Sequence, residues 1–286
     1  MLQGPVVMGT SNPGAVYSDF GGVARNVAQN LARLGCGLLL CSRVGDDEAG
    51  RSVQALGRGR LDTSLITVSG SRPTASYTAI LESTGELVLG LADMAVYDEV
   101  TPAVLAGAMP RLREAGLWFV DTNLPEETIG WLLDRAEDAV APIPVAVDAI
   151  SVAKSRRLLP WLARITYLFC NVAQAGALVG RAVPEPREAA EALVELGAVR
   201  GIVSAGARGI AVYEDGRVKA MAALAARPRD VTGAGDALVS GTLYGLWQGM
   251  DLGAAARLGL AAAAITVESE SAAAAGVTVE ALHARA

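Results

Sequence analysis

Short apolar runs alternate with helical patterns along most of the chain, and this alternation limits the possible folds more than any other feature. Each run is bounded by Gly, Pro, Asp or Asn and is typical of a buried strand. The predicted strands are Leu38–Cys41, Leu117–Asp121, Val145–Asp148, Tyr167–Cys170 and Gly201–Ser204. Strands that alternate with helices predict a doubly wound, mostly parallel α/β sheet with helices on both faces.

The helical patterns between these strands have apolar residues three or four positions apart, as in Val23, Val27, Leu31 and Leu34. Further helices are expected to begin near Pro102, Glu126 and Pro186, because Pro and acidic residues suit a first helical turn. The sequence contains no repeat or linker, and its 286 residues fit one large α/β domain. We therefore expect a single domain over residues 1–286.

Two hairpins interrupt the alternation. Residues 74–80 and 86–91 flank the turn residues Ser83, Thr84 and Gly85, and the first arm has Thr and Ser at alternate positions. This pattern predicts a hairpin with one polar face, which would cover a site as a small β lid. We expect lid segments near residues 10–20 and 72–93. A second hairpin is expected over residues 209–221, around the favoured turn pair Asp215-Gly216.

Composition excludes several kinds of chemistry. His283 is the only histidine and the only lysines are Lys154 and Lys219, so triads, histidine-rich metal sites and a P-loop are not expected. No G-x-G-x-x-G motif occurs. The net charge is −6 without any basic run, which argues against nucleic acid as a partner.

The three cysteines, Cys36, Cys41 and Cys170, form no C-x-x-C pair, so neither a disulfide framework nor a structural zinc site is expected. The longest apolar stretch, residues 258–267, is too short to cross a bilayer and predicts a buried helix. We therefore expect a cytoplasmic protein that does not bind membranes.

The stretch DVTGAGDA, residues 230–237, carries the most chemical information. Gly233, Ala234 and Gly235 allow a tight turn at the start of a helix, where unpaired N–H groups form an anion-binding cradle. Asp236 in the first helical turn would then take a proton from an attacking hydroxyl group. The alternative is structural: Thr232 caps the helix and Asp236 only complements its dipole.

The stretch GGVARN places Gly21 and Gly22 directly before an amphipathic helix. The glycines would let a ligand approach the backbone closely, and Asn26 lies on the side of the helix opposite Val27 and Leu31. The alternative is an ordinary helix start with a polar face.

Together, GGVARN, GDDEAG (residues 45–50) and DVTGAGDA resemble the two signatures of the ribokinase-like (PfkB) carbohydrate kinase family, in the same order. SAGARG (residues 204–209) is similar to the nucleotide loop of that family. Within the family, SNPG (residues 11–14), the lid segment 74–94 and VDAIS with the following Lys154 resemble pseudouridine kinases. This resemblance implies transfer of the ATP γ-phosphoryl group to a sugar hydroxyl, most closely the 5′-hydroxyl of pseudouridine.

The resemblance also implies roles for individual residues. Asp236 would be the base, with Gly233, Ala234 and Gly235 as the anion hole. Gly22 and Asn26 would hold sugar hydroxyls, while Asn12 and Asp93 would line the substrate site under the lid. Contacts to ATP would come from Asn171, Ser204, Gly206 and Gly209. Mg²⁺ is implied as a cofactor, Asp230 and the Val231 carbonyl would bind a monovalent cation such as K⁺, and we expect a homodimer.

The sequence departs from the family pattern at three places. Gln174 replaces the Glu of Asn-x-x-Glu, a motif tied to magnesium, and Ala149 replaces a Pro. The opening strand of the family and its substrate-binding Asp have no counterpart. We therefore expect upstream residues that encode an apolar strand followed by Asn-x-Asp; the alternative is that Pro5–Gly9 fills this strand.

Two other functions are open. The chain could be a kinase for another sugar or nucleoside, because lid residues set the choice of acceptor. Gln174 and the short N-terminus leave open a weakly active kinase-like protein that binds ligand and regulates or scaffolds, although the intact Asp236 argues against it.

Overall fold

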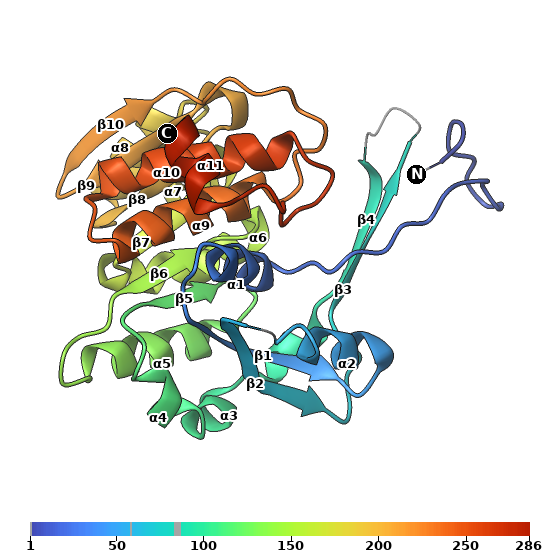
Figure 1. Ribbon diagram of the computed structural model, residues 1–286, viewed down its shortest axis with the longest axis horizontal. Coiled ribbons are helices and arrows are strands. Elements are labelled where there is room, and N and C mark those ends of the chain that lie inside the picture. Colours follow the sequence, from blue (N-terminus) through green and yellow to red (C-terminus); the bar gives the residue numbers. More distant parts are fainter. Residues whose placement is uncertain (1, 58, 83–86) are drawn as a thin grey trace.

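Six strands form the central sheet of the computed structural model, which describes residues 2–57, 59–82 and 87–286 (Figure 1). The strand order is β10–β9–β8–β7–β6–β5. Four of these strands run parallel, namely β5 (Trp118–Asp121), β6 (Val145–Asp148), β7 (Tyr167–Asn171) and β8 (Arg200–Ser204). The hairpin of β9 (Ile210–Glu214) and β10 (Arg217–Met221) completes the sheet in antiparallel fashion. The predicted mostly parallel sheet and the second hairpin are confirmed.

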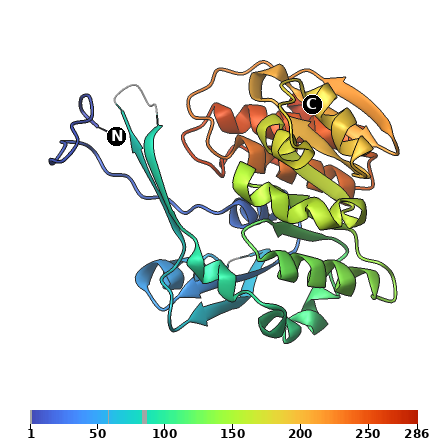
Figure 2. The same cartoon turned by 180° about the vertical axis from the view of Figure 1, so that it is seen from behind.

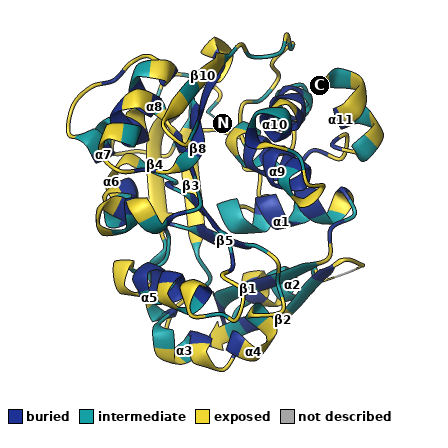
Figure 3. Cartoon of the chain, turned by 90° about the vertical axis from the view of Figure 1, so that its left-hand side faces the viewer, coloured by how far each residue is buried: buried dark blue, intermediate teal, exposed yellow. Residues whose placement is uncertain are grey.

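Helices cover both faces of this sheet, as the alternation of the strand residues requires. On β6, Val145 and Val147 pack in one core cluster and Ala146 packs in the other. The first cluster includes α5 (Glu126–Glu137), α7 (Val172–Val179) and α8 (Pro186–Glu195). The second includes α1 (Val23–Arg33), α9 (Ala234–Trp247) and α10 (Leu252–Val267). In Figure 3, α9 and α10 are coloured largely as buried, and α9 is buried on all its sides from Ala237 to Gly245.

The predicted helix starts are confirmed, because α1 begins at Val23, α5 at Glu126 and α8 at Pro186. A short α3 (Pro102–Ala106) begins at the predicted Pro102, and the side chain of Thr101 caps it. The remaining helices are α2 (Glu48–Gln54), α4 (Met109–Leu112), α6 (Val152–Ser155) and α11 (Val279–Arg285), with 3₁₀ turns η1 (Ala95–Glu99), η2 (Arg156–Arg164) and η3 (Gly206–Arg208).

Two small sheets lie apart from the central one. β1 (Leu38–Gly45) pairs in parallel with β2 (Leu61–Ser69), a strand that sequence analysis missed. β3 (Ser76–Leu81) and β4 (Leu87–Asp93) form the expected antiparallel lid hairpin, which extends away from the central sheet beside the N-terminal segment (Figure 2). The predicted turn residues Ser83–Gly85 lie outside the described residues.

The N-terminal segment does not form a strand in the central sheet. Residues 5–9 have no strand assignment, and Leu2 instead donates its backbone N–H to the carbonyl oxygen of Leu81 in the lid, over 2.8 Å. The alternative that Pro5–Gly9 fills an opening strand is therefore wrong. Within the described residues, β5 is an edge of the central sheet and β1 pairs only with β2. The upstream strand stays a prediction.

Candidate active site

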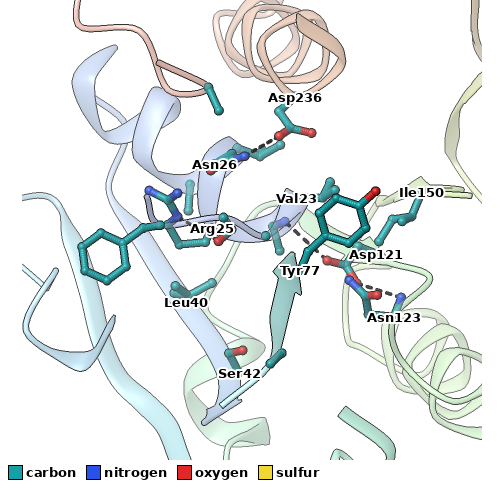
Figure 4. A pocket seen from close by; sticks show the side chains of 18 of the residues that line it. Val23, Arg25, Asn26, Leu40, Ser42, Tyr77, Asp121, Asn123, Ile150 and Asp236 are labelled. Atoms are coloured by element: carbon teal, nitrogen blue, oxygen red, sulfur yellow. Dashed lines mark hydrogen bonds between the residues drawn. The ribbon is translucent and has the colours of Figure 1, made fainter. Parts of the chain in front are cut away.

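A large cavity of about 2340 Å³ lies where the lid meets the body of the protein. Its walls come from the N-terminal segment, α1, the strands β1, β3 and β5, and the start of α9. Asp236, Asn26 and Asp121 all line it, together with Tyr77 from the lid (Figure 4). The two glycine-rich stretches, about 210 residues apart in the sequence, therefore meet at one site.

Asp236 is held by Asn26 at the centre of this site. The Nδ2 atom of Asn26 donates a hydrogen bond to Oδ2 of Asp236 over 2.6 Å. Asn26 is 5% exposed, and its Oδ1 atom has no hydrogen-bond partner among the described residues. A buried acceptor of this kind is unfavourable unless a donor reaches it, which a substrate hydroxyl group would do.

A second polar contact lies one helical turn further from the cavity. Asn30 donates from Nδ2 to the Oγ atom of Ser240 over 3.4 Å, and that hydroxyl donates to the carbonyl oxygen of Asp236 over 2.5 Å. Residues four apart lie on the same face of a helix, so the two contacts fix α1 against α9. The side chain of Asn26 is positioned by this packing.

The turn before α9 depends on Gly233. Its φ of +78° lies in the left-handed region, and a Cβ atom there would lie 2.1 Å from the carbonyl oxygen of Ala272. Nothing lies within 4 Å of the corresponding point at Gly235, which leaves space for a ligand to approach the backbone. The first N–H groups of a helix have no acceptor within it, so this turn is suited to an anion. The structural alternative required Thr232 to cap α9. The structure shows no side-chain hydrogen bond that caps this helix.

Burial makes Asp236 a stronger base than an exposed carboxylate. It raises the pKa of Asp236 to about 6, against the smaller lowering effect of the hydrogen bond from Asn26. The nearby charge of Asp121 raises this pKa further, and that of Arg25 lowers it. A base that titrates just below neutral pH is mostly ionised in the cell and still accepts a proton readily.

Two further carboxylates, which sequence analysis did not select, lie near Asp236. Asp121 ends β5 and accepts hydrogen bonds from the backbone N–H groups of Asn123 and Ala24, over 2.9 and 3.4 Å. Asp148 ends β6, and burial raises its pKa to about 7. Both predicted strands ended in Val-Asp, and ligands of open α/β sheets bind at the carboxyl ends of parallel strands. The Val-Asp ending of each strand was therefore the sequence signal that could have identified Asp121 and Asp148.

Lys154 supplies a positive charge to the same wall. Its Nζ atom donates a hydrogen bond to Oδ1 of Asn123, and its pKa is lowered by burial against the opposing attraction of Asp121. Arg157 braces the adjoining loop, because it donates to the backbone carbonyl oxygens of residues 122, 123 and 124. The sequence feature VDAIS with Lys154 therefore lies at the cavity.

The predicted substrate residues are only partly brought together. Gly22 precedes α1 with a φ of +99°, and Asn12 lines the cavity while its side chain bonds the backbone of Val7. Asp93 is exposed at the end of β4, accepts the N–H of Ala95 over 3.4 Å, and does not line the cavity.

The predicted nucleotide residues gather at the carboxyl ends of β7 and β8, outside the cavity lining. Asn171 and Ser204 are register partners there, while Gly206 begins η3 and Gly209 follows it. Asn171 and Gln174 form a capping box, in which each side chain accepts the backbone N–H of the other, over 2.9 and 2.8 Å. Gln174 is thus used to cap α7.

The residues proposed for cations do not form an acidic cluster. Asp230 accepts the N–H of Thr232 over 2.8 Å, and Val231 is 71% exposed. In the described part of the chain, no three His, Cys, Asp or Glu side chains gather as a metal site. Mg²⁺ would therefore have to be held largely by phosphate oxygens and water. No helix among the described residues is long and apolar enough to cross a membrane.

Comparisons with known proteins agree with this geometry. Pseudouridine kinase of Escherichia coli is 34% identical over 238 residues, which cover 81% of this chain and 74% of that protein. The uncharacterized sugar kinase YeiI of the same organism is 31% identical over 266 residues, which cover 91% of this chain and 72% of that protein. The two relatives are similar to this chain to nearly the same degree.

Among solved structures, a carbohydrate kinase from Agrobacterium tumefaciens matches with a TM-score of 0.85 and 34% identity, over 99% of this chain and 91% of that one. The family model described as pfkB family carbohydrate kinase matches residues 6–278. The chain therefore belongs to the pfkB family of carbohydrate kinases.

Proposed function

We propose that this carbohydrate kinase transfers the γ-phosphoryl group of ATP to the 5′-hydroxyl of pseudouridine. The observation that carries the proposal is the Asn26–Asp236 pair, which faces the cavity at the glycine turn of α9. Support for the acceptor comes from the similarity to pseudouridine kinase and from the resemblance of the lid and of the stretch 147–151 to that group.

In the proposed reaction, Asp236 accepts the proton of the 5′-hydroxyl group as the new oxygen–phosphorus bond forms. The bond between the γ-phosphorus and the ADP oxygen breaks, and ADP leaves. The N–H groups of Gly233 and Gly235 stabilise the charge on the transferred group, whereas the N–H of Ala234 donates to the carbonyl oxygen of Val231 over 3.3 Å. Mg²⁺, when bound to ATP, neutralises phosphate charge.

The remaining predicted residues take roles around this centre. Asn26 and Gly22 hold sugar hydroxyl groups, with the open Oδ1 atom of Asn26 as an acceptor. Asn171, Ser204, Gly206 and Gly209 contact the nucleotide at the ends of β7 and β8. Their position at the carboxyl edge of the sheet supports this role.

A kinase for another sugar or nucleoside is the second candidate, because YeiI is nearly as similar as pseudouridine kinase. Turnover of ATP against pseudouridine, uridine, adenosine, ribose and fructose 6-phosphate decides between them. We expect kcat/KM for pseudouridine to exceed that for ribose by more than about tenfold. Comparable values would reduce the assignment to a general sugar kinase, and no turnover with any acceptor would favour a regulatory protein.

A further inference from the structure

The lid presents two different faces. Residues at alternate positions of a strand share a face, so Tyr77 and Ala79 on β3 lie with Gly90 and Ala92 on β4. The opposite face carries larger apolar side chains, including Ile80, Leu89 and Leu91. The positions of this face nearest to Tyr77 carry the small residues Ala79, Gly90 and Ala92, and Val88 lies further along β4.

Gly90 lets the Tyr77 ring lie against the hairpin. A Cβ atom at Gly90 would lie 2.4 Å from the hydroxyl oxygen of Tyr77 and 3.1 Å from its Cζ atom. The ring is thus supported by the backbone of β4, while the side chain stays 58% exposed. An exposed aromatic ring on a support of small residues offers a flat surface of the kind on which planar groups stack.

This surface belongs to the cavity of the active site. Tyr77, Ala79 and Ala92 line the cavity, as do Ser76, Thr78 and Ile80 from the other face of β3, whereas Leu89 and Leu91 do not. Figure 4 shows Tyr77 among the side chains that line the cavity, in the same view as Asp236, Asp121 and Asn123. The lid therefore brings an aromatic ring to the cavity that Asp236 also lines.

The polar groups at Asp236 determine which part of an acceptor binds beside it. Asn26 leaves its buried Oδ1 atom without a partner beside Asp236, so the hydroxyl-bearing sugar belongs at these two residues. A free pentose would leave the lid surface uncontacted. A nucleoside carries a planar base on the same sugar, and bases stack favourably on aromatic side chains.

We propose that the ring of Tyr77 is the stacking platform for the base of the acceptor, so that Tyr77 selects nucleosides over free sugars. This inference rests on the proposed function and adds the residue that recognises the base. Stacking does not distinguish pseudouridine from uridine, since both carry a planar uracil. Tyr77 accordingly selects the class of substrate and not the individual nucleoside.

The test compares Tyr77→Leu and Tyr77→Phe, with Leu91→Ala on the opposite face of the lid as the control. For each variant, kcat/KM is measured with pseudouridine, uridine and ribose. Removal of a stacking side chain typically weakens binding about tenfold or more. We therefore expect Tyr77→Leu to lower the values for both nucleosides by about tenfold or more, with ribose changed by less than about twofold.

Tyr77→Phe keeps the ring and should stay within about threefold of the wild type for every substrate. The control Leu91→Ala should leave the preference for nucleosides over ribose unchanged. The inference is overturned if Tyr77→Leu retains the wild-type preference, or if it reduces turnover of ribose as strongly as that of nucleosides. A wild-type enzyme that prefers ribose would instead refute the proposed function itself, and the inference with it.

Discussion

The amide of Asn26 on α1 donates to the carboxylate of Asp236 on α9 over 2.6 Å, and the two residues are 210 positions apart in the sequence. Neither side chain is freely solvated: Asn26 is 5% exposed, and burial raises the pKa of Asp236 to about 6. The hydrogen bond orients the carboxylate and partly offsets the effect of burial on its pKa. Burial thus sets the raised pKa of Asp236, and one contact between the two glycine-rich stretches orients its carboxylate and moderates that pKa.

Asp236→Asn should lower kcat by a factor on the order of 10² to 10⁴, which is the usual contribution of general base catalysis. Affinity for ATP should change little, because the anion-binding turn is made of backbone. Glu48→Gln is the matched control, since Glu48 is also an acidic residue in the first turn of a helix, α2, but is exposed and does not line the cavity. Steady-state turnover and ATP binding measure both effects. A variant that keeps more than about a tenth of wild-type kcat would show that Asp236 only complements the helix dipole.

The pH dependence of kcat/KM should report the ionisation of Asp236. In the proposed reaction the carboxylate form of Asp236 is the base, and its pKa is about 6, so activity should be low at pH 5, rise through pH 6 and level off above pH 7. The measurement is kcat/KM for the preferred acceptor at saturating ATP from pH 5 to 8. A profile that is flat down to pH 4.5, as for an exposed aspartate, would contradict the buried environment of this group.

Asn26→Ala should move this profile to higher pH. The hydrogen bond from Asn26 stabilises the charged form of Asp236 and lowers its pKa, so its loss lets burial raise the pKa further. We expect the acidic limb to shift upward by about half a pH unit or more, together with a lower plateau. The shift distinguishes a positioning contact from simple loss of substrate binding, which would lower the plateau and leave the midpoint in place.

Much of this arrangement could be predicted from sequence because it is local. The Gly233–Asp236 turn and its helix are specified by neighbouring residues, and the buried strands are specified by short apolar runs with polar ends. The strand β2 was missed because its burial is irregular, so that no clean alternation marks it.

The contacts between distant residues could not be predicted in this way. Nothing in the local pattern shows that Asn26 meets Asp236, or that Asp121 accepts the N–H of Ala24 at the start of α1. The faces of the lid could not be assigned from the local pattern either. Tyr77 and Asp93 lie on opposite faces of the hairpin, and only the strand register shows this. Ile150 adopts a φ of +51°, which a β-branched residue rarely does and which no sequence rule predicts.

Gly233→Ala should remove activity and destabilise the protein. The left-handed backbone at Gly233 costs an alanine about 1–2 kcal/mol, and its Cβ would lie 2.1 Å from the carbonyl oxygen of Ala272. Relief of that clash must displace the turn that carries Asp236. Gly235→Ala is the control for folding, because its Cβ meets no atom within 4 Å. Thermal unfolding and turnover are the measurements; a Gly233→Ala enzyme with wild-type melting temperature would contradict this account.

Asp148→Asn should stabilise the protein, and more strongly at pH 8 than at pH 5. Burial raises the pKa of Asp148 to about 7, from 3.8 as the reference value for the unfolded chain. Between these two values the native state binds more protons than the unfolded state, so this group makes stability fall as pH rises. Above pH 7 the buried charge is fully formed, and its cost is then greatest. Asparagine removes the charge, and its Oδ1 atom can still accept the N–H of Ile150, which Asp148 does over 2.7 Å.

Chemical denaturation of both proteins at pH 5, 6, 7 and 8 measures this difference. We expect the variant to be more stable by on the order of 4 kcal/mol at pH 8, since the pKa shift is about three units and each unit corresponds to about 1.4 kcal/mol. The gap should narrow steadily toward pH 5, where Asp148 is protonated in the native state. The charges of Asp121 and Asp236 contribute to the raised pKa of Asp148, so the gap also includes the loss of their repulsion with Asp148. A gap that does not change with pH would mean that Asp148 does not carry a buried charge at neutral pH.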